Sequence, residues 1–149
     1  MADAETPVYA VLLAGGVGSR LWPVSRDLSP KQLVKFFGRD SLIQATVKRL
    51  LPVTAADNIR IVCGREHRDE ITRHLKEIGL AAGDRIICEP CGRNTAPAIL
   101  LAVLKILQLE KEAVLCVFPA DHVIKDAAVF RDRLRSAISL ADNGYVVTF

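Results

Sequence analysis

The sequence predicts an α/β fold, a three-layer α/β/α sandwich around a mostly parallel sheet. Short apolar runs bounded by turn residues alternate along the chain with longer stretches of helical spacing, which is typical of this class. The apolar run over 8–14 is unbroken rather than alternating, as expected for a central strand covered on both faces. With 149 residues, half of them hydrophobic, the chain is large enough to form one domain with its own core.

The first predicted strand ends in a glycine-rich turn that contains Gly15, Gly16 and Gly18. Residues without a Cβ allow main-chain N–H groups to approach an anion, and consecutive N–H groups in such a turn form a binding concavity. Cationic side chains follow the turn: Arg20, Arg26, Lys31 and Lys35. The pattern therefore predicts a phosphate-binding loop, in which Arg20 and Lys31 supply the positive charge.

Two common phosphate loops do not match this turn. The Walker pattern requires a Lys directly after its last glycine, and none stands at that spacing here. The dinucleotide fingerprint G-x-G-x-x-G would place its third glycine at Leu21, and Trp22 and Pro23 follow where its helix should begin. The sequence thus excludes a P-loop NTPase and disfavours a dehydrogenase.

The remaining elements are expected to alternate helix and strand. Ser41 and Gln44 form a capping box for the next helix, which Pro52 ends. The expected order is a helix over 41–51, a strand over 59–63, a helix over 66–78, a strand over 85–88, a helix over 95–109, a buried strand over 114–118, a helix with a core stripe over 127–141, and a fifth strand starting at 145.

Three expectations concern the helix surfaces. The helix over 66–78 buries Ile71 and Leu75 and is capped by Gly79, which leaves His67 and His74 on the solvated side. The helix over 95–109 is apolar nearly all round and is expected to be buried on more than one side. Its N-cap is Asn94, and Pro97 is tolerated in its first turn.

Composition limits the partners and the compartment. A net charge of +3, a pI of about 8.8 and 5% aromatic residues fit small anionic substrates and disfavour nucleic acid. The longest apolar stretch, over 96–109, is interrupted by Lys105 and is shorter than the about 20 residues that a membrane span needs. The segment over 1–7 has no signal-peptide character, so a cytoplasmic protein without a membrane partner is expected.

The four cysteines are expected to be free thiols. Cys88 and Cys91 have C-x-x-C spacing, but no second such pair completes a tetrahedral zinc site. Cys63 and Cys116 fall within apolar strand patterns, where cysteine packs as a small hydrophobe. A reducing compartment keeps such thiols free.

Three segments carry a resemblance to a known family. LAGGVGSRLWPVSRDLSPKQ, from Leu13, contains the G-x-G-x-R-L and P-K signature of the sugar-1-phosphate nucleotidyltransferases. EPCGRNTAPAI over 89–99 and PADHVI over 119–124 are similar to the family's mannose-1-phosphate guanylyltransferase (GDP-mannose pyrophosphorylase) branch. The resemblance implies the Rossmann-like fold of the nucleotide-diphospho-sugar transferase type.

The resemblance also implies roles for these segments. Arg20 would grip the β- and γ-phosphates of GTP, Lys31 would act on the α-phosphate, and the segment around Arg93 to Thr95 would select guanine. Asp121 would hold Mg²⁺, which relieves the cost of a lone carboxylate after a buried strand. The implied nucleotide-binding residues are Leu13, Ala14, Gly15, Gly16, Gly18, Ser19, Arg20, Lys31, Glu89, Pro90, Arg93, Asn94, Thr95 and Ala120.

Other charged residues have no such role. Arg26 and Lys35 are expected to be solvated, and His122 either orients its loop or packs. The implied reaction joins GTP and mannose-1-phosphate to give GDP-mannose and pyrophosphate. Two alternatives remain open: a nucleotide-binding module without turnover, and a thymidylyl- or adenylyltransferase acting on another sugar-1-phosphate.

The chain ends inside an apolar run at Phe149. Residues 1–149 are therefore expected to be the N-terminal nucleotide-binding portion of the domain, truncated after the fifth strand, with the sugar-binding remainder absent. This portion should bind nucleotide without completing the reaction. Its open sheet edge would favour self-association or a homo-oligomer.

Overall fold

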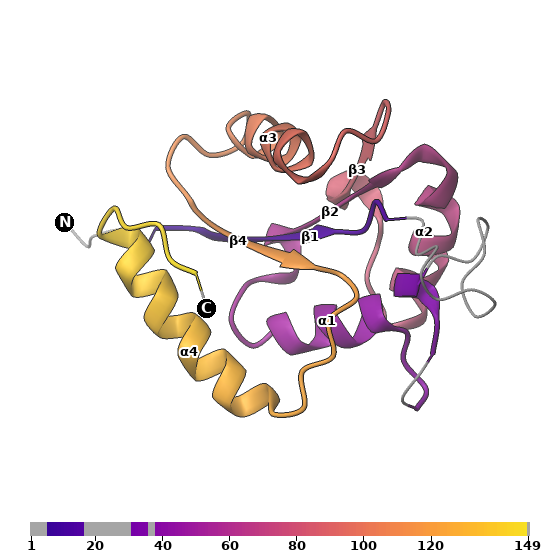
Figure 1. The fold of residues 1–149 in the computed structure, drawn as a ribbon, viewed down its shortest axis with the longest axis horizontal. Coiled ribbons are helices and arrows are strands. Elements are labelled where there is room, and N and C mark those ends of the chain that lie inside the picture. Colours follow the sequence, from indigo (N-terminus) through magenta and orange to yellow (C-terminus); the bar gives the residue numbers. More distant parts are fainter. Residues whose placement is uncertain (1–5, 17–30, 36–37, 149) are drawn as a thin grey trace.

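The computed structural model describes residues 6–16, 31–35 and 38–148. The strands of these residues form one parallel sheet in the order β3-β2-β1-β4 (Figure 1). Their bounds are β1 (Val8–Leu13), β2 (Ile59–Gly64), β3 (Ile86–Glu89) and β4 (Val114–Pro119). The predicted α/β class is confirmed.

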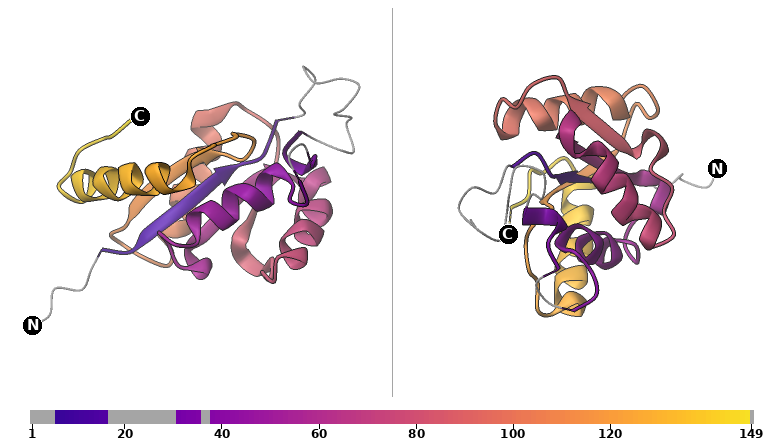
Figure 2. Two further views of the ribbon diagram at one scale, coloured as in Figure 1. Left: turned by 90° about the horizontal axis from the view of Figure 1, so that it is seen from below. Right: turned by 90° about the vertical axis from the view of Figure 1, so that its right-hand side faces the viewer.

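Helices lie on both faces of the sheet, as the two further views in Figure 2 also show. They are α1 (Leu42–Leu50), α2 (Arg68–Glu77), α3 (Thr95–Ile106) and α4 (Ala127–Asp142). Helices α1, α2 and α4 pack in one core cluster, and α3 packs in the other. Short 3-10 turns connect the elements: η2 (Lys31–Leu33), η3 (Ala56–Asn58), η4 (Arg65–His67) and η5 (Gly83–Arg85).

The side chains of β1 explain why its sequence is apolar throughout. Ala10 and Leu12 point to the face that α1, α2 and α4 cover, whereas Tyr9 and Val11 point to α3. All four are at most 4% exposed. A strand buried on both faces cannot alternate apolar and polar residues.

Parallel pairing brings the ends of all these strands to one edge of the sheet, called here the carboxyl edge. In the register, Leu13 pairs with Val62 of β2 and with Pro119 of β4. Strand order reverses at β1, because β2 and β3 extend the sheet on one side and β4 on the other. Ligands of open α/β sheets bind beside such a reversal, at the carboxyl edge.

The local signals for helix ends are confirmed. At the start of α1, Ser41 Oγ accepts from the Gln44 N–H at 3.5 Å, and the Ser41 N–H donates to Gln44 Oε1 at 2.8 Å. Gly79 follows α2 with a φ of 78°, which favours glycine. Both devices satisfy backbone groups that have no partner inside the helix.

The expectation that His67 and His74 lie on the solvated side is wrong, since they are 2% and 3% exposed. Helix α2 starts at Arg68, after the η4 turn, so His67 stands at its N-cap rather than on a helical face. His74 packs toward α1, where its Nδ1 lies 2.8 Å from Ser41 Oγ. A polar partner on the neighbouring helix makes burial of the ring favourable.

The burial expected for α3 is also wrong. Only Ala98, Ala102 and Ile106 of this helix are buried, whereas Leu100 and Leu104 are 57% and 53% exposed. A single helix covers this face of the sheet in the described structure, so its outer side has no packing partner there. An apolar sequence alone did not reveal how many elements would pack on it.

Two expectations about the last strands need correction. Strand β4 forms, but of its residues only Val114 is buried, because β4 is an edge of the sheet. The described residues 145–148 form no strand, and Val146 is 97% exposed. The Tyr145 N–H bonds to the Leu140 carbonyl, which completes the end of α4 rather than starting a fifth strand.

Candidate nucleotide-binding site

The carboxyl edge brings together the described parts of the three segments that the sequence singled out. The Ala14 N–H donates to the Val62 carbonyl at 2.8 Å, and the Ala120 N–H donates to the Leu13 carbonyl at 3.0 Å. These bonds extend the sheet by one residue at its centre. Residues 14–16 therefore lie between the segments that follow β3 and β4.

One side of β1 forms a cavity of about 370 Å³, called here the Glu89 pocket. Seven of its lining residues are among those that the resemblance implied. The lining consists of Leu13, Gly15, Gly16, Val62, Glu89, Gly92, Arg93, Asn94, Thr95 and Ala98. The pocket thus joins the glycine turn to the segment that connects β3 with α3.

Glu89 ends β3 and brings a carboxylate into this pocket. The residue is 8% exposed, and its side chain makes no hydrogen bond with the described residues. A Cβ on Gly15 would lie 2.7 Å from Glu89 Oε2, closer than real Cβ contacts allow, whereas a Cβ on Gly16 would meet nothing within 4 Å. A side chain at Gly15 would therefore displace the Glu89 carboxylate from its present position, whereas the main chain of Gly16 is open to a ligand.

The far wall of the Glu89 pocket is the start of α3. Asn94 takes the N-cap position as predicted, but its φ is 68° and its side chain makes no capping bond. The helix therefore presents first-turn N–H groups that no cap side chain satisfies, together with the positive end of its dipole. Arg93 and Thr95 are exposed beside it. This wall can accept polar or anionic groups.

On the other side of β1, Lys31 Nζ lies 2.9 Å from Asp121 Oδ2. The two residues stand far apart in the sequence, and their side chains are 34% and 33% exposed. This arrangement is called here the Lys31–Asp121 pair. An ion pair this exposed contributes little stability, so both groups are available for exchange with a ligand.

Asp121 is chemically suited to a magnesium ion as a single protein ligand. Mg²⁺ takes hard oxygen ligands and usually keeps one or two carboxylates together with water and substrate phosphates. Among the described residues, no three His, Cys, Asp or Glu side chains gather to hold a metal. Nucleotide phosphates would therefore have to complete the coordination.

Gln32 was not predicted as part of the site, yet it attaches the η2 turn to the end of β1. The side chain is 3% exposed, and its Nε2 donates to the Ala14 carbonyl at 2.7 Å, directly before the glycine turn. The bond fixes the η2 turn, and with it Lys31, against the end of β1. The sequence offered no signal for this contact, because an amide after Pro-Lys is also typical of an exposed turn.

Several predicted residues take other positions. Ala14 and Ala120 are 2% and 1% exposed and belong to the core beneath the site. Pro90 is exposed and does not line the Glu89 pocket. Gly18, Ser19, Arg20 and Arg26 lie outside the described residues.

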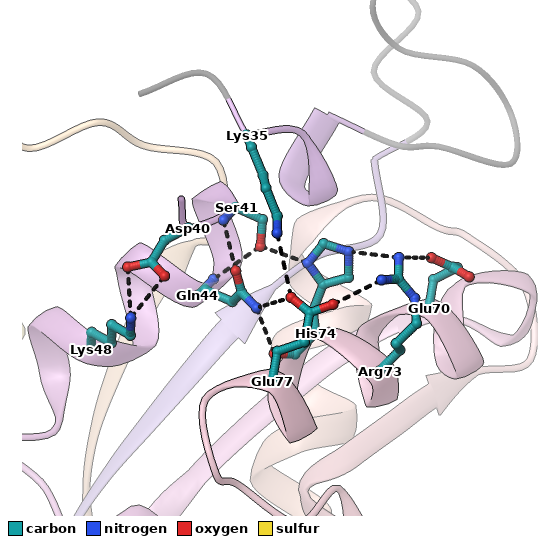
Figure 3. A network of polar contacts seen from close by, with 9 residues as sticks. All are labelled: Lys35, Asp40, Ser41, Gln44, Lys48, Glu70, Arg73, His74 and Glu77. Carbon is teal, nitrogen blue, oxygen red and sulfur yellow. Dashed lines mark hydrogen bonds and ion pairs between the residues drawn. The ribbon is translucent and has the colours of Figure 1, made fainter. Parts of the chain in front are cut away.

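Lys35 follows the η2 turn and is exposed, as expected, at the margin of a polar network between α1 and α2 (Figure 3). Its Nζ lies 3.5 Å from Glu77 Oε2, and Gln44 Nε2 donates to that same oxygen at 2.9 Å. His74 lies at the centre of the network. Burial, followed by the nearby Arg73 cation, lowers the pKa of His74.

The four cysteines take part in no group of three possible metal ligands among the described residues. Cys63 is buried, and burial followed by the neighbouring Cys88 thiol raises its pKa to about 12. Burial raises the pKa of Cys116 to about 11. Such thiols remain protonated at neutral pH and pack as apolar groups. All four cysteines are free.

The parallel sheet, the glycine turn at its reversal point and the polar segments at one edge are typical of α/β proteins that bind ligands at the carboxyl edge. Comparison with known families gives the particular class. The model of the nucleotidyl transferase family matches residues 9–149. The chain belongs to this family, as its sequence motifs predicted.

Curated relatives are longer than this chain. It is 46% identical over 142 residues to a mannose-1-phosphate guanylyltransferase of Salmonella montevideo, which covers 95% of the chain and 29% of the relative. It is 42% identical over 142 residues to the alginate biosynthesis protein AlgA of Pseudomonas aeruginosa, covering 93% and 28%. The chain thus spans less than a third of these relatives.

Solved structures show the same fold. A Thermus thermophilus protein described as a mannose-1-phosphate geranyltransferase superposes with a TM-score of 0.80 at 34% identity, over 93% of this chain and 39% of its own. A Helicobacter pylori protein described as a mannose-6-phosphate isomerase gives 0.71 at 29% identity, over 93% and 48%. None of the helices in the described part of this chain has the length and apolar character to cross a membrane.

Proposed function

We propose that this chain binds GTP together with Mg²⁺ at the carboxyl edge, as the nucleotide-binding portion of a mannose-1-phosphate guanylyltransferase. The complete reaction would join GTP to mannose-1-phosphate and release pyrophosphate. Relatives that carry this name cover nearly the whole chain at 42–46% identity. The observation that carries the proposal is the buried Glu89 carboxylate in a pocket beside the glycine turn.

The Glu89 carboxylate favours guanine. Glu89 as a whole is 8% exposed, and none of the described residues donates a hydrogen bond to its carboxylate, so donors from a ligand would be favourable there. Guanine presents two adjacent donors on one edge, the N1–H and the exocyclic amine. Adenine places an acceptor at N1, which would face the carboxylate unfavourably. This contrast argues against the adenylyltransferase alternative. Thymine, the base of the thymidylyltransferase alternative, presents only one donor to the carboxylate.

The Lys31–Asp121 pair favours a bound triphosphate on the other side of β1. Nucleotidyl transfer needs little covalent help, so positioning and charge stabilisation carry most of the catalysis. Lys31 would turn from Asp121 to the α-phosphate, where charge builds up as the sugar phosphate attacks. Asp121 would hold Mg²⁺, which neutralises phosphate charge when bound. Arg20 would contact the β- and γ-phosphates.

Sugar binding is proposed to come from the part of the relatives that this chain does not span. The chain alone would then bind GTP without releasing pyrophosphate. The alternative of a binding module is the same outcome at this length. Turnover is measured by pyrophosphate release from GTP and mannose-1-phosphate, and a rate proportional to the concentration of this chain would contradict the assignment of the sugar site.

Calorimetry with GTP, ITP and ATP in the presence of Mg²⁺ tests the proposal directly. ITP lacks the exocyclic amine but keeps the N1–H, so its affinity should fall between those of GTP and ATP. The loss per missing charge-assisted bond should be about 1.5–3 kcal/mol. Equal affinities for all three nucleotides would reject the base assignment, and absence of binding would reject the proposal for this chain.

A further inference from the structure

Arg49 of α1 is a buried cation next to the segment that carries Asp121. It is 9% exposed, and its Nη2 donates to Thr46 Oγ1 and to the His122 carbonyl, both at 3.2 Å. Its guanidinium carbon lies 5.4 Å from the centroid of the Phe130 ring of α4. Arg49 thus contacts its own helix, the segment after β4 and helix α4.

No carboxylate of the described residues forms an ion pair with Arg49. Burial lowers the pKa of its guanidinium below the usual value. Keeping an unpaired cation in this place costs free energy that an apolar side chain at the same position would avoid. A carbonyl and a ring face can hold a guanidinium, and they fix its plane and its reach. The free-energy cost of the buried guanidinium is best explained by the part of the chain that Arg49 holds in place.

The part held in place is the main chain of His122, the residue after Asp121. Asp121 follows Ala120, whose N–H is fixed to Leu13, so the segment is fixed on one side by the sheet and on the other by Arg49. Between these two bonds stands the carboxylate that pairs with Lys31. Loss of either bond would allow the carboxylate to turn away from β1.

We propose that Arg49 is a positioning residue that orients Asp121 toward the metal and the nucleotide phosphates through the His122 carbonyl. The inference rests on the proposed function, since it concerns the same site. Among the described residues, Arg49 forms no hydrogen bond with a residue that lines the Glu89 pocket. Its effect should therefore fall on the phosphates and not on the base.

Arg60 of β2 provides a matched control within the same chain. It is 7% exposed, its Nη1 donates to the Asp57 and Ile59 carbonyls at 2.6 and 3.0 Å, and its guanidinium carbon lies 5.2 Å from the Tyr9 ring centroid. Arg60 stands at the start of its strand, at the edge opposite the site. The two arginines share their chemistry and differ in location.

The experiment compares Arg49→Met with Arg60→Met. Urea unfolding should show similar changes in the stability of both variants, because each loses carbonyl and ring contacts and each removes the cost of a buried cation. Calorimetry should show that Arg49→Met lowers the Mg²⁺-dependent part of GTP affinity about tenfold, as for other residues that orient metal ligands. Its guanosine affinity should stay unchanged. Arg60→Met should bind both ligands as the unsubstituted chain does.

Two lysine variants and one double variant keep the test decisive. Arg49→Lys and Arg60→Lys retain the cation and can be used if a methionine variant does not fold, and Arg49→Lys should show a smaller loss of the same kind. In the background of Asp121→Asn, substitution of Arg49 should have no further effect on GTP affinity, because the two act through one group.

The outcomes separate the inference from the proposed function. An unchanged Mg²⁺ dependence in Arg49→Met, or equal losses for GTP and guanosine, would overturn the inference while GTP binding by the unsubstituted chain still supports the function. Equal effects of the Arg49 and Arg60 substitutions would overturn it too, since they would point to stability alone. Absence of Mg²⁺-dependent GTP binding in the unsubstituted chain would overturn both.

Discussion

The end of β1 divides the candidate site into two sides with different electrostatics. On one side, Glu89 is 8% exposed and makes no hydrogen bond with the described residues. On the other, the Asp121 side chain is 33% exposed and already pairs with Lys31. A buried carboxylate prefers fixed donors such as those of a base, whereas an exposed one can exchange its partner for a metal and phosphates. The same functional group thus has two different environments, set by its depth.

Asp121→Asn should have the largest effect of any single substitution on the exposed side. The change removes the charge that attracts Mg²⁺ and keeps the shape of the side chain, so the fold should remain intact. Calorimetry should show that Mg²⁺ no longer increases GTP affinity. Guanosine affinity should stay the same, because the proposed base contacts lie in the Glu89 pocket. Retention of the full Mg²⁺ dependence would show that the metal is held elsewhere.

Lys31→Ala should separate the metal from the phosphates. Loss of a charge-assisted contact should weaken GTP binding by about 1.5–3 kcal/mol and leave guanosine binding unaffected. Because Asp121 loses its pairing cation, Mg²⁺ should bind the variant without nucleotide more readily than it binds the unsubstituted chain. Lys48 of α1, which forms an exposed ion pair with Asp40, is the matched control. Arg20→Ala should show the same preference for triphosphate.

Equal losses of GTP and guanosine affinity in Lys31→Ala would contradict this division of the site. They would mean that Lys31 supports the fold around β1 and does not act on the phosphates. The η2 turn has a second attachment through Gln32, so unfolding of the turn is not the expected result.

Glu89→Gln should act in the opposite way, with losses of about 1–2 kcal/mol that are equal for GTP and guanosine. The amide can accept one bond from guanine but brings its own donors into the pocket, so discrimination against adenine should decline. Competition between GTP and ATP measures the change. If Glu89→Gln lowered GTP affinity alone, the carboxylate would belong to the phosphate side and the comparison between the two sides would fail.

The sequence predicted the segments of the candidate site but not the contacts between them. The segments were identified because strands, glycines and charged residues repeat patterns with a known physical cause, and parallel strands must bring their ends to one edge. The contacts that hold the site in shape were not predicted. Gln32 to Ala14 and Arg49 to His122 join residues that are 18 and 73 positions apart, and no local pattern records such pairs.

The errors in the fold prediction have the same origin. His74 was assigned to the surface because its own helix gave no reason to bury it, and the reason lies on α1 at Ser41. Helix α3 was expected to be buried on more than one side because Leu100 and Leu104 are apolar, yet both are more than half exposed. Periodicity within an element predicts its type, while burial depends on how many other elements pack against it.

Acid should affect the two faces of the sheet unequally through His74, with the smallest of the expected effects. Its Nε2 lies 3.2 Å from Arg73 Nη2, and its Nδ1 lies 2.8 Å from Ser41 Oγ (Figure 3). The arginine can only donate, so Nε2 accepts and Nδ1–H donates to the hydroxyl, which requires the neutral ring. Burial and the arginine charge accordingly lower the pKa of His74 in the folded chain.

A lowered pKa in the folded state means that the unfolded chain takes up the proton first as the pH falls. The contribution of His74 to stability is therefore complete above its ordinary pKa of about 6.5 and is lost progressively as the pH falls through the lowered value. Hydrogen bonds from Arg73 and Gln44 lower the pKa values of Glu70 and Glu77, so these carboxylates stay charged over the same window. The polar network joins α1 to α2, whereas α3 and the Glu89 pocket lie on the other face of the sheet.

Amide hydrogen exchange measured between pH 8 and 5.5, corrected for intrinsic rates, should show loss of protection in α1 and α2 before α3. The variant His74→Gln is the control, because its side chain can bond to Ser41 but does not titrate. Its protection should be lower at pH 8 and should change less with pH. Simultaneous loss in α3, or the same pH response in His74→Gln, would show that another group controls the acid sensitivity and that this network does not act on one face of the sheet alone.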